Sequence, residues 1–132
     1  MQHRTQTILS TLWIFIVLNM FARDIHELGR PGMLEQMMSG VIDGVVITEE
    51  LMLIGGLMME VFLIMVVLSQ VLTYRINRIT NLVMAFIGIA IVVATNLTPD
   101  LDNIFFMVIE LTALLAIIFK AWKWHEQPQA DA

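Results

Sequence analysis

The chain has 132 residues, of which 58% are hydrophobic and 14% are charged, and its mean hydropathy is +0.81. A soluble domain of this size has a large surface to cover and usually carries about 25% charged residues, so the composition argues against a water-soluble monomer and against a disordered chain. The net charge of −5 has the wrong sign for a nucleic-acid partner, and the absence of cysteine excludes disulfides, thiolate metal sites and cysteine nucleophiles. We therefore expect an integral membrane protein that forms one domain.

Four stretches are long and apolar enough to cross a bilayer as helices, which takes about 20 mainly apolar residues. Helices are favoured because a lone strand leaves its backbone groups unpaired in lipid, and the stretches lack the alternation of an outer-membrane barrel. The sequence predicts an all-α fold, an integral membrane four-helix bundle in a single domain of residues 1–125, followed by a disordered tail, 126–132. The predicted spans are residues 7–22, 51–74, 82–98 and 104–124.

The first span, residues 7–22, has one competing interpretation. A basic start, an apolar middle and the small residue Ala22 are also features of a cleaved signal peptide. The apolar run is long for a signal, however, and Asn19-Met20-Phe21-Ala22 is a poor cleavage site. The residues that follow continue a helical pattern, so we interpret the segment as a retained transmembrane helix.

The connection after the first span, residues 23–47, is long for a loop without structure, and loops of this length are often functional. The helix is predicted to continue to Leu28 and to break at Gly29-Arg30-Pro31-Gly32. A short amphipathic helix is expected over Met33 to Ser39, at the membrane interface. The segment from Val41 to Val46 has an Asp-Gly pair at its centre, which is typical of a tight β-hairpin.

The other two connections are short. Residues 75–78 are polar and basic, and they predict a tight turn between antiparallel second and third helices. Residues 98–102 are expected to form the last turn, in which Pro99 cannot continue the third helix and Thr98 or Asp100 can cap the fourth.

The lysines and arginines predict the orientation of the chain, because cytoplasmic loops are rich in them. If both termini face the cytoplasm, the aromatic residues Tyr74, Trp122 and Trp124 fall near the inner boundary of the bilayer, where amphipathic rings prefer to lie. We therefore expect both termini in the cytoplasm. The inner side then holds Arg4, Arg75, Arg78, Lys120 and Lys123, and the outer side holds only Arg23 and Arg30.

Three stretches carry a resemblance to a known family. They are Ser10-Thr11-Leu12-Trp13-Ile14-Phe15 followed by Asn19, then Gly55-Gly56-Leu57-Met58-Met59-Glu60, and then Leu72-Thr73-Tyr74-Arg75-Ile76-Asn77-Arg78. From about residue 10 to residue 124, the chain resembles an uncharacterised family of small bacterial membrane proteins with four predicted helices. The resemblance implies four helices and a bacterial inner membrane, and it implies no activity, substrate or catalytic residue. In size and helix count the chain is also loosely similar to DoxX-like proteins, a likeness of architecture alone.

Polar residues inside the predicted spans form the candidate site, because ionisable groups at membrane depth are costly and are often functional. Glu60 in the second span and Glu110 in the fourth lie at about the same depth, since both helices are expected to run from outside to inside. Gly56, one turn above Glu60, opens space beside it or lets another helix approach. We predict an outward-opening polar pocket with an apolar floor, in which the two carboxyls face each other and share one proton, or Arg23 neutralises one of them. The predicted ligand-binding residues are Glu60, Glu110, Asn19, Asn96, Arg23, His26 and Gly56.

Each of these residues also has a structural interpretation. The carboxyls could bond across helices or pair with Arg23, and Asn19 and Asn96 could join helices by hydrogen bonds. His26 could bind a metal or sense pH, although a solvated helix end is the commoner state of such a residue, and metal binding stays open. The eleven methionines lack a consistent ligand spacing and are expected to pack rather than to bind copper. The spans contain no histidine for haem ligation and no nucleotide-binding loop, so no cofactor is expected.

Three functions fit this pattern. The first is a small transporter-like or ligand-binding membrane protein whose glutamates bind a cation, a proton or an amine, with a homodimer as the expected assembly. The second is a structural or accessory subunit that docks onto a larger membrane partner through the segment between the first two spans. The third is an intramembrane enzyme that acts on a lipid or a quinone with paired carboxylates as acid and base. An enzyme is the less expected class.

Overall fold

The computed structural model describes residues 2–97 and 100–125. These residues form five α-helices and one two-stranded antiparallel sheet, which confirms the predicted all-α class. Four of the helices are long and apolar enough to cross a membrane, as the sequence predicts. In chain order the elements are α1 (Gln2–Glu27), α2 (Met33–Ser39), β1 (Val41–Ile42), β2 (Val45–Val46), α3 (Glu49–Val71), α4 (Tyr74–Ala94) and α5 (Leu101–Trp122).

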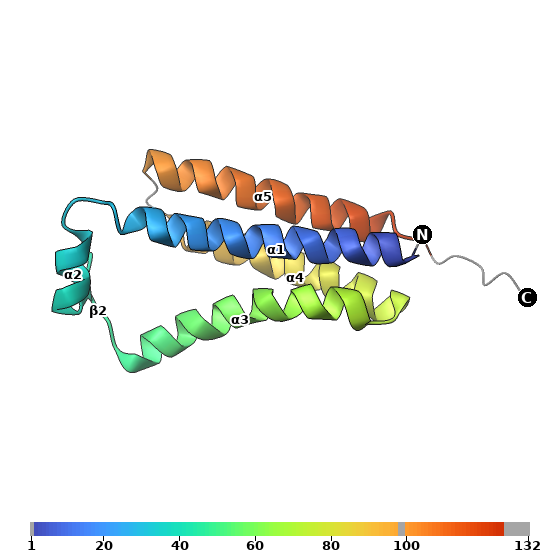
Figure 1. Ribbon diagram of the computed structural model, residues 1–132, viewed down its shortest axis with the longest axis horizontal. Coiled ribbons are helices and arrows are strands. Elements are labelled where there is room, and N and C mark those ends of the chain that lie inside the picture. Colours follow the sequence, from blue (N-terminus) through green and yellow to red (C-terminus); the bar gives the residue numbers. More distant parts are fainter. Residues whose placement is uncertain (1, 98–99, 126–132) are drawn as a thin grey trace, which may run out of the picture.

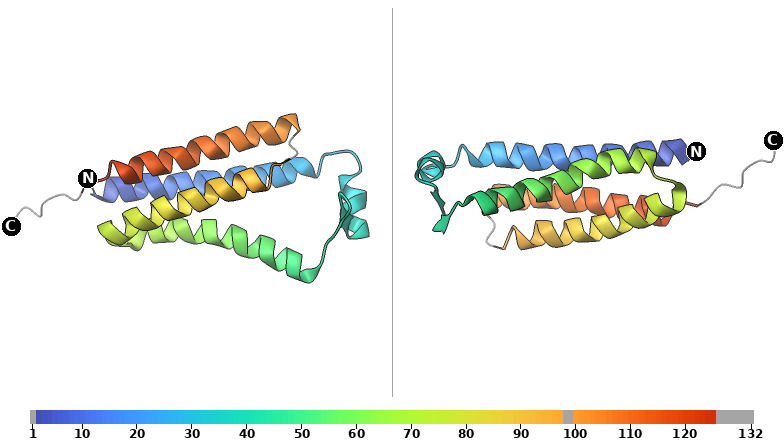
Figure 2. Two further views of the ribbon diagram at one scale, coloured as in Figure 1. Left: turned by 180° about the vertical axis from the view of Figure 1, so that it is seen from behind. Right: turned by 90° about the horizontal axis from the view of Figure 1, so that it is seen from below.

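The four long helices lie side by side (Figure 1). The start of α1 and the end of α5 lie at one end, here called the termini end, and α2 with the hairpin lies at the other, the loop end. α1 packs against both α3 and α5, and α4 packs chiefly against α5. Figure 2 shows the same arrangement from behind and from below. α1 is therefore the helix that holds α3 to the other long helices.

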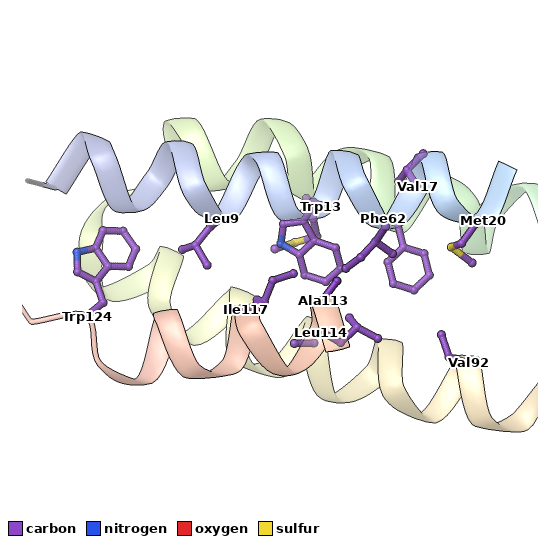
Figure 3. Close-up of a cluster of buried hydrophobic side chains, with 13 residues drawn as sticks. Leu9, Trp13, Val17, Met20, Phe62, Val92, Ala113, Leu114, Ile117 and Trp124 are labelled. Atoms are coloured by element: carbon purple, nitrogen blue, oxygen red, sulfur yellow. The ribbon is translucent and has the colours of Figure 1, made fainter. Parts of the chain in front are cut away.

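Buried apolar side chains from all four long helices form one core (Figure 3). Its largest fully buried member is Trp13 of α1, whose ring centroid lies 5.8 Å from that of Phe62 of α3. Gly88 of α4 packs closely against α5, because a Cβ added there would lie 2.8 Å from Leu114 Cδ2. A larger residue at this position would force the Leu114 side chain or the helices to shift, so the glycine favours their close contact.

The turn between α3 and α4 differs from the prediction. We expected a turn at residues 75–78 and a third span that begins at residue 82, but α4 already begins at Tyr74. The prediction includes Asn77 in the turn because the segment is short and basic. Asn77 is in fact buried in the first turns of α4, where its amide donates to the Ser69 carbonyl at 2.8 Å. A polar residue near the end of a span is therefore no sign of a loop when a carbonyl of the preceding helix is within reach.

The remaining boundaries agree with the prediction to within a few residues. The spans expected at 7–22, 51–74 and 104–124 fall on α1, α3 and α5. Asp100 caps α5 as expected, since its side chain accepts a hydrogen bond from the Asn103 N–H at 3.2 Å. Thr98 and Pro99, expected to lie in the last turn, and the tail 126–132, expected to be disordered, lie outside the described residues.

The predicted short helix and hairpin at the loop end are both present. α2 has the predicted bounds, and the turn residues Asp43 and Gly44 have positive φ angles of 47° and 81°. Two successive positive φ angles are typical of a type I′ hairpin turn, in which glycine is unstrained. Arg30 donates to both carboxylate oxygens of Asp43, at 3.0 and 3.3 Å, and so ties the hairpin to the segment that follows α1.

The loop-end half of α3 stands apart from the other helices (Figure 1). Every residue from 48 to 57 is exposed, whereas Phe62, Met65 and Ser69 farther along the helix are buried. Among the described residues, no element buries the side chains of the first turns of α3. The contact between α3 and the rest of the protein is therefore concentrated toward the termini end.

Candidate functional site

Glu110 of α5 is fully buried where α5 packs against α1. Its carboxylate forms an ion pair with Arg23, whose Nη1 donates to Oε2 at 3.2 Å. The amide of Asn19 donates to Oε1 at 3.4 Å and to the Phe106 carbonyl at the same distance. Glu110, Arg23 and Asn19 therefore form one buried polar cluster between two helices, which we call the Glu110 cluster.

The sequence explains how this cluster forms. Asn19 and Arg23 are four residues apart, so they share one face of α1 and reach the same carboxylate. A buried charge is strongly destabilising unless it is paired and hydrogen-bonded, and Glu110 is both. The Arg23 side chain is only 14% exposed, so the pair is nearly closed to solvent. This arrangement agrees with the structural interpretation of Glu110, an ion pair with Arg23 that joins two helices.

Glu60 lies on the surface of the protein, where α1 and α3 meet. Its side chain is exposed and lines an apolar groove of about 550 Å³. Within the described part of the chain, no hydrogen-bond or ion-pair partner contacts its carboxylate. We call this site the Glu60 groove. Its other lining residues are Ile14, Val17, Leu18 and Phe21 of α1 and Leu63, Ile64, Val66 and Val67 of α3.

The structure does not bring the two glutamates together, which corrects the prediction of a shared pocket. Leu18 and Phe21 of the Glu60 groove lie roughly 100–160° around α1 from Asn19 and Arg23 of the Glu110 cluster, at about 100° per residue. α1 therefore stands between the two carboxyls. The prediction failed because it matched the glutamates by their depth along parallel helices, and equal depth does not determine the direction in which a side chain points.

Three further residues predicted to line the shared pocket belong neither to the Glu60 groove nor to the Glu110 cluster. Gly56 is exposed on α3, and a Cβ added there would meet no described atom within 4 Å. Asn96, just past the end of α4, donates to the Val92 carbonyl of that helix at 2.7 Å. His26 lies at the surface of the loop end, with its Nδ1 2.9 Å from Asp102 Oδ2. These residues make local contacts, and the structure gives them no common site.

Three acidic side chains at the loop end form the single group, among the described residues, whose geometry could hold a metal ion. One oxygen each of Glu27, Asp100 and Asp102 lies within 4.8 Å of the others. Neighbouring side chains already bond to these carboxylates: Asn103 donates to Glu27 at 2.9 Å and to Asp100 at 2.8 Å, and His26 contacts Asp102. Because the chain itself supplies partners for all three, we assign no metal to this group.

A second buried polar cluster lies toward the termini end, where we expected an apolar floor. Trp13 Nε1 donates to Asn81 Oδ1 at 2.7 Å, and Ser69 Oγ donates to the same oxygen at 3.2 Å. The Asn81 amide donates to the Asn77 carbonyl at 2.9 Å. All four residues are fully buried and together link α1, α3 and α4. We call them the Asn81 cluster.

Residue spacing could have revealed the Asn81 cluster. Asn77, Asn81, Ala85 and Gly88 recur at intervals of four, four and three, which is the spacing of one helix face, and all four are buried. The small residues on this face, Ala85 and Gly88, indicate a close helix contact. The two asparagines on the same face are therefore also expected to be buried. The sequence interpretation missed this because it placed Asn77 in a turn.

Comparisons with known proteins place the chain in a family but assign no activity to it. No curated protein and no solved structure matches the chain. One family profile matches residues 1–131, which is nearly the whole sequence, and the four long apolar helices fit the resemblance to small four-helix membrane proteins. The chain therefore belongs to DUF6326, a family of unknown function.

Proposed function

We propose that the chain is an integral protein of the bacterial inner membrane, whose four long helices form a transmembrane bundle with both termini in the cytoplasm. The length and hydropathy of the helices support this placement. Large apolar side chains also cover the outside of the helices, where lipid would solvate them; examples are Leu18, Leu57 and Phe86. The concentration of lysine and arginine at the termini end supports the orientation.

Within this bundle, the Glu60 groove binds a lipophilic cation, such as an amine with an apolar body. The observation that carries the proposal is the single carboxyl of Glu60, without a partner among the described residues, in a groove that is otherwise apolar. A carboxylate in surroundings of low dielectric constant attracts a cation far more strongly than one in water does. The apolar walls favour the body of the same ligand, so one molecule satisfies both parts of the site.

The position of the groove supports entry from the bilayer. Leu18 and Val67 on its walls are 61% and 58% exposed, so the groove is open along the outer surface of α1 and α3. A ligand dissolved in lipid would reach Glu60 sideways, without separation of the helices. The volume of about 550 Å³ lies inside the range of roughly 300–1,000 Å³ typical of small-molecule sites.

Glu110 has a different role in this proposal. Arg23 neutralises it and α1 covers it, so it joins two helices and is not offered to a ligand. The proposal keeps the ligand class expected from the sequence, a cation or an amine. It differs from that expectation in the site, which contains one glutamate instead of two.

The test is the binding of tetraphenylphosphonium, a permanent lipophilic cation, to the purified full chain in lipid nanodiscs, measured by calorimetry. Glu60→Gln removes the charge with little change in shape, and we expect at least a tenfold loss of affinity, equivalent to about 1.4 kcal/mol. Glu60→Asp keeps the charge and should retain most of the affinity.

Two further variants separate the groove from general effects of charge. Glu50→Gln removes the same charge from the exposed start of α3, outside the groove, and should leave the affinity unchanged. Ile64→Trp fills the groove but keeps Glu60, and should weaken binding as much as Glu60→Gln does. Equal affinity of wild type and Glu60→Gln, with helix content unchanged by circular dichroism, would overturn the proposal.

A second candidate function, that of an accessory subunit in a larger membrane assembly, is favoured by the loop-end half of α3. Residues 48–57 are exposed on every face, and they include Gly55 and Gly56, where an added Cβ would meet no described atom within 4 Å. Small residues allow the backbone of another helix to approach closely. The proposed partner is a transmembrane helix, from a second copy of the chain or from another protein.

The absence of cysteine allows a direct test of this candidate. Ile54→Cys lies on the exposed half of α3, and Val83→Cys is a matched lipid-facing control on α4. Oxidative cross-linking in native membranes should trap a dimer or a second protein at position 54 and not at position 83. Equal cross-linking at the two positions would remove this candidate.

A further inference from the structure

A pocket of about 330 Å³ lies on α4 at the termini end. At about 100° per residue, its lining residues fall within an arc of roughly 140°, so they share one face of the helix. Along this face an aromatic residue and two arginines come first, and two aliphatic residues follow toward the middle of the helix. The lining residues are Tyr74, Arg75, Arg78, Ile79 and Leu82.

The charge around this pocket is positive. Five of the seven lysines and arginines of the chain lie in the termini-end segments, two of them in the pocket itself. The acidic residues of the described part lie at the loop end or midway along the helices. The described part of the termini end therefore favours anions, and two arginines, Arg75 and Arg78, line its pocket.

The polar rim of the pocket is held in place by the end of α5. Arg78 Nε donates to the Ala121 carbonyl at 3.1 Å, and Nη2 donates to the Trp122 carbonyl at 3.2 Å. The Tyr74 hydroxyl donates to the Trp124 carbonyl at 2.8 Å, and the two aromatic rings pack edge to face. These contacts fix the rim before any ligand arrives, which lowers the entropic cost of binding. A guanidinium has five N–H groups, so Arg78 keeps donors for an anion.

We propose that this pocket binds an anionic phospholipid, with its phosphate at Arg75 and Arg78 and an acyl chain along Ile79 and Leu82. Arginine suits this role because its planar donors match phosphate oxygens. From Arg75 to Leu82 the helix rises about 10 Å, which is less than the roughly 15 Å depth of one leaflet. A soluble phosphate would contact only the rim, whereas a phospholipid contacts the charged and the aliphatic parts alike.

The test is lipid retention by the full chain, measured by native mass spectrometry from detergent micelles. Phosphatidylglycerol should bind at least fivefold more tightly than phosphatidylcholine with the same acyl chains. A difference of about fivefold in affinity is what one basic side chain contributes to the binding of an anionic lipid. Arg75→Gln should lower the affinity for phosphatidylglycerol about fivefold. Lys120→Gln removes one charge from the same end but outside the pocket and should lower it less than about twofold.

The aliphatic part of the pocket has its own matched pair of variants. Ile79 and Ile76 are exposed to similar extents, 63% and 56%, but only Ile79 lines the pocket. Ile79→Trp should therefore reduce retention of phosphatidylglycerol, and Ile76→Trp should not. Excess inorganic phosphate should not displace the lipid.

Three outcomes would overturn the proposal, provided that circular dichroism shows every variant to be folded. They are equal retention of phosphatidylglycerol and phosphatidylcholine, equal effects of Arg75→Gln and Lys120→Gln, and displacement of the lipid by inorganic phosphate alone. The last outcome would assign the rim to a soluble anion.

Discussion

Glu60 and Glu110 are the same residue type, each midway along an apolar helix, and their surroundings are opposite. Glu110 is fully buried and bonded to Arg23 and Asn19. Glu60 is exposed in an apolar groove, and no described side chain pairs with it. α1 supplies both environments, the polar one from one face and the apolar one from the opposite face.

The comparison shows that depth alone does not mark an ionisable residue as functional. A charge that has found its counter-ion inside the protein is accounted for by helix packing. A charge without a described partner in apolar surroundings is unfavourable by itself, which supports our proposal that Glu60 binds a cation. We therefore expect changes at Glu110 to alter stability and changes at Glu60 to alter binding.

The largest expected effect comes from Glu110→Leu, which leaves Arg23 buried without a counter-ion. The free energy of unfolding should fall by about 3–5 kcal/mol. The double variant Glu110→Leu/Arg23→Met should recover most of this loss, because apolar side chains of similar volume can replace a buried ion pair. Unfolding of the chain in micelles, followed by circular dichroism, measures both effects. A double variant no more stable than Glu110→Leu would contradict the pairing.

Asn81→Leu tests whether the neutral Asn81 cluster stabilises the packing of the helices, as the charged Glu110 cluster is expected to do. The variant leaves the Trp13 N–H and the Ser69 hydroxyl without their acceptor. We expect a loss of about 1–3 kcal/mol for each group left unsatisfied, measured by the same unfolding experiment. Adding Trp13→Phe removes the Trp13 N–H, one of the two donors left without an acceptor, and should recover part of that loss. If Asn81→Leu is as stable as the wild type, the cluster does not hold the helices together.

Gly88→Ala tests packing without any change in polarity. Its Cβ would lie 2.8 Å from Leu114 Cδ2 and 3.1 Å from Phe62 Cε1, so we expect a loss of about 1–3 kcal/mol. Gly56→Ala is the matched control, since a Cβ there meets no described atom within 4 Å. That variant should be unchanged or more stable by about 0.5–1 kcal/mol, because alanine favours the helix. Equal effects of the two substitutions would show that Gly88 does not set the contact between α4 and α5.

Glu60→Leu is the direct counterpart of Glu110→Leu. Because no described partner is lost, the free energy of unfolding should change by less than about 0.5 kcal/mol. The same variant should no longer bind tetraphenylphosphonium. A loss of stability as large as that of Glu110→Leu would mean that Glu60 also has a structural partner. It would contradict the conclusion that the two glutamates have different roles.

The smallest effect is expected from Asp100, an exposed carboxylate at the start of α5. The Asn103 N–H donates to it and holds its pKa below the ordinary value of 3.8. A carboxyl whose pKa is lower in the folded state stabilises the fold above its ordinary pKa, and this contribution disappears as the pH falls through the folded value. Asp100→Ala should therefore unfold at a slightly lower temperature than the wild type at neutral pH. The difference should vanish well below pH 3.8, and a difference independent of pH would contradict the hydrogen bond as its cause.

The order of the elements could be predicted almost entirely, because local signals determine it. The break at residues 29–32 is rich in glycine and proline, and the Asp43-Gly44 pair is a strong signal for a hairpin, so α2 and the strands were found at their observed positions. The long helices were found from hydropathy alone. Their ends were less certain, as α4 shows, because a polar residue near a boundary can lie either in the turn or in the helix.

The faces of the helices could not be predicted with the same success. In a water-soluble protein the polar face of a helix marks the outside, but here the surface and the core are equally apolar, and periodicity no longer separates them. Glu60 and Glu110 therefore gave the same signal, although one faces outward and the other is buried. The candidate residues were identified, and Arg23 was predicted as the counter-ion of one glutamate. Only the structure shows that this glutamate is Glu110 and that Glu60 has no partner among the described residues.

The central position of α1 has a consequence for biogenesis. Arg23 and Glu110 are separated by 87 residues in the chain. At about 5–20 residues per second, the ribosome delivers the glutamate roughly 4–17 s after the arginine. During that interval the arginine has no counter-ion from α5, and α3 is delivered only partway through it. A nascent chain that stops before residue 110 would leave this cation unmatched, and such truncated products are the ones we expect membrane proteases to recognise first.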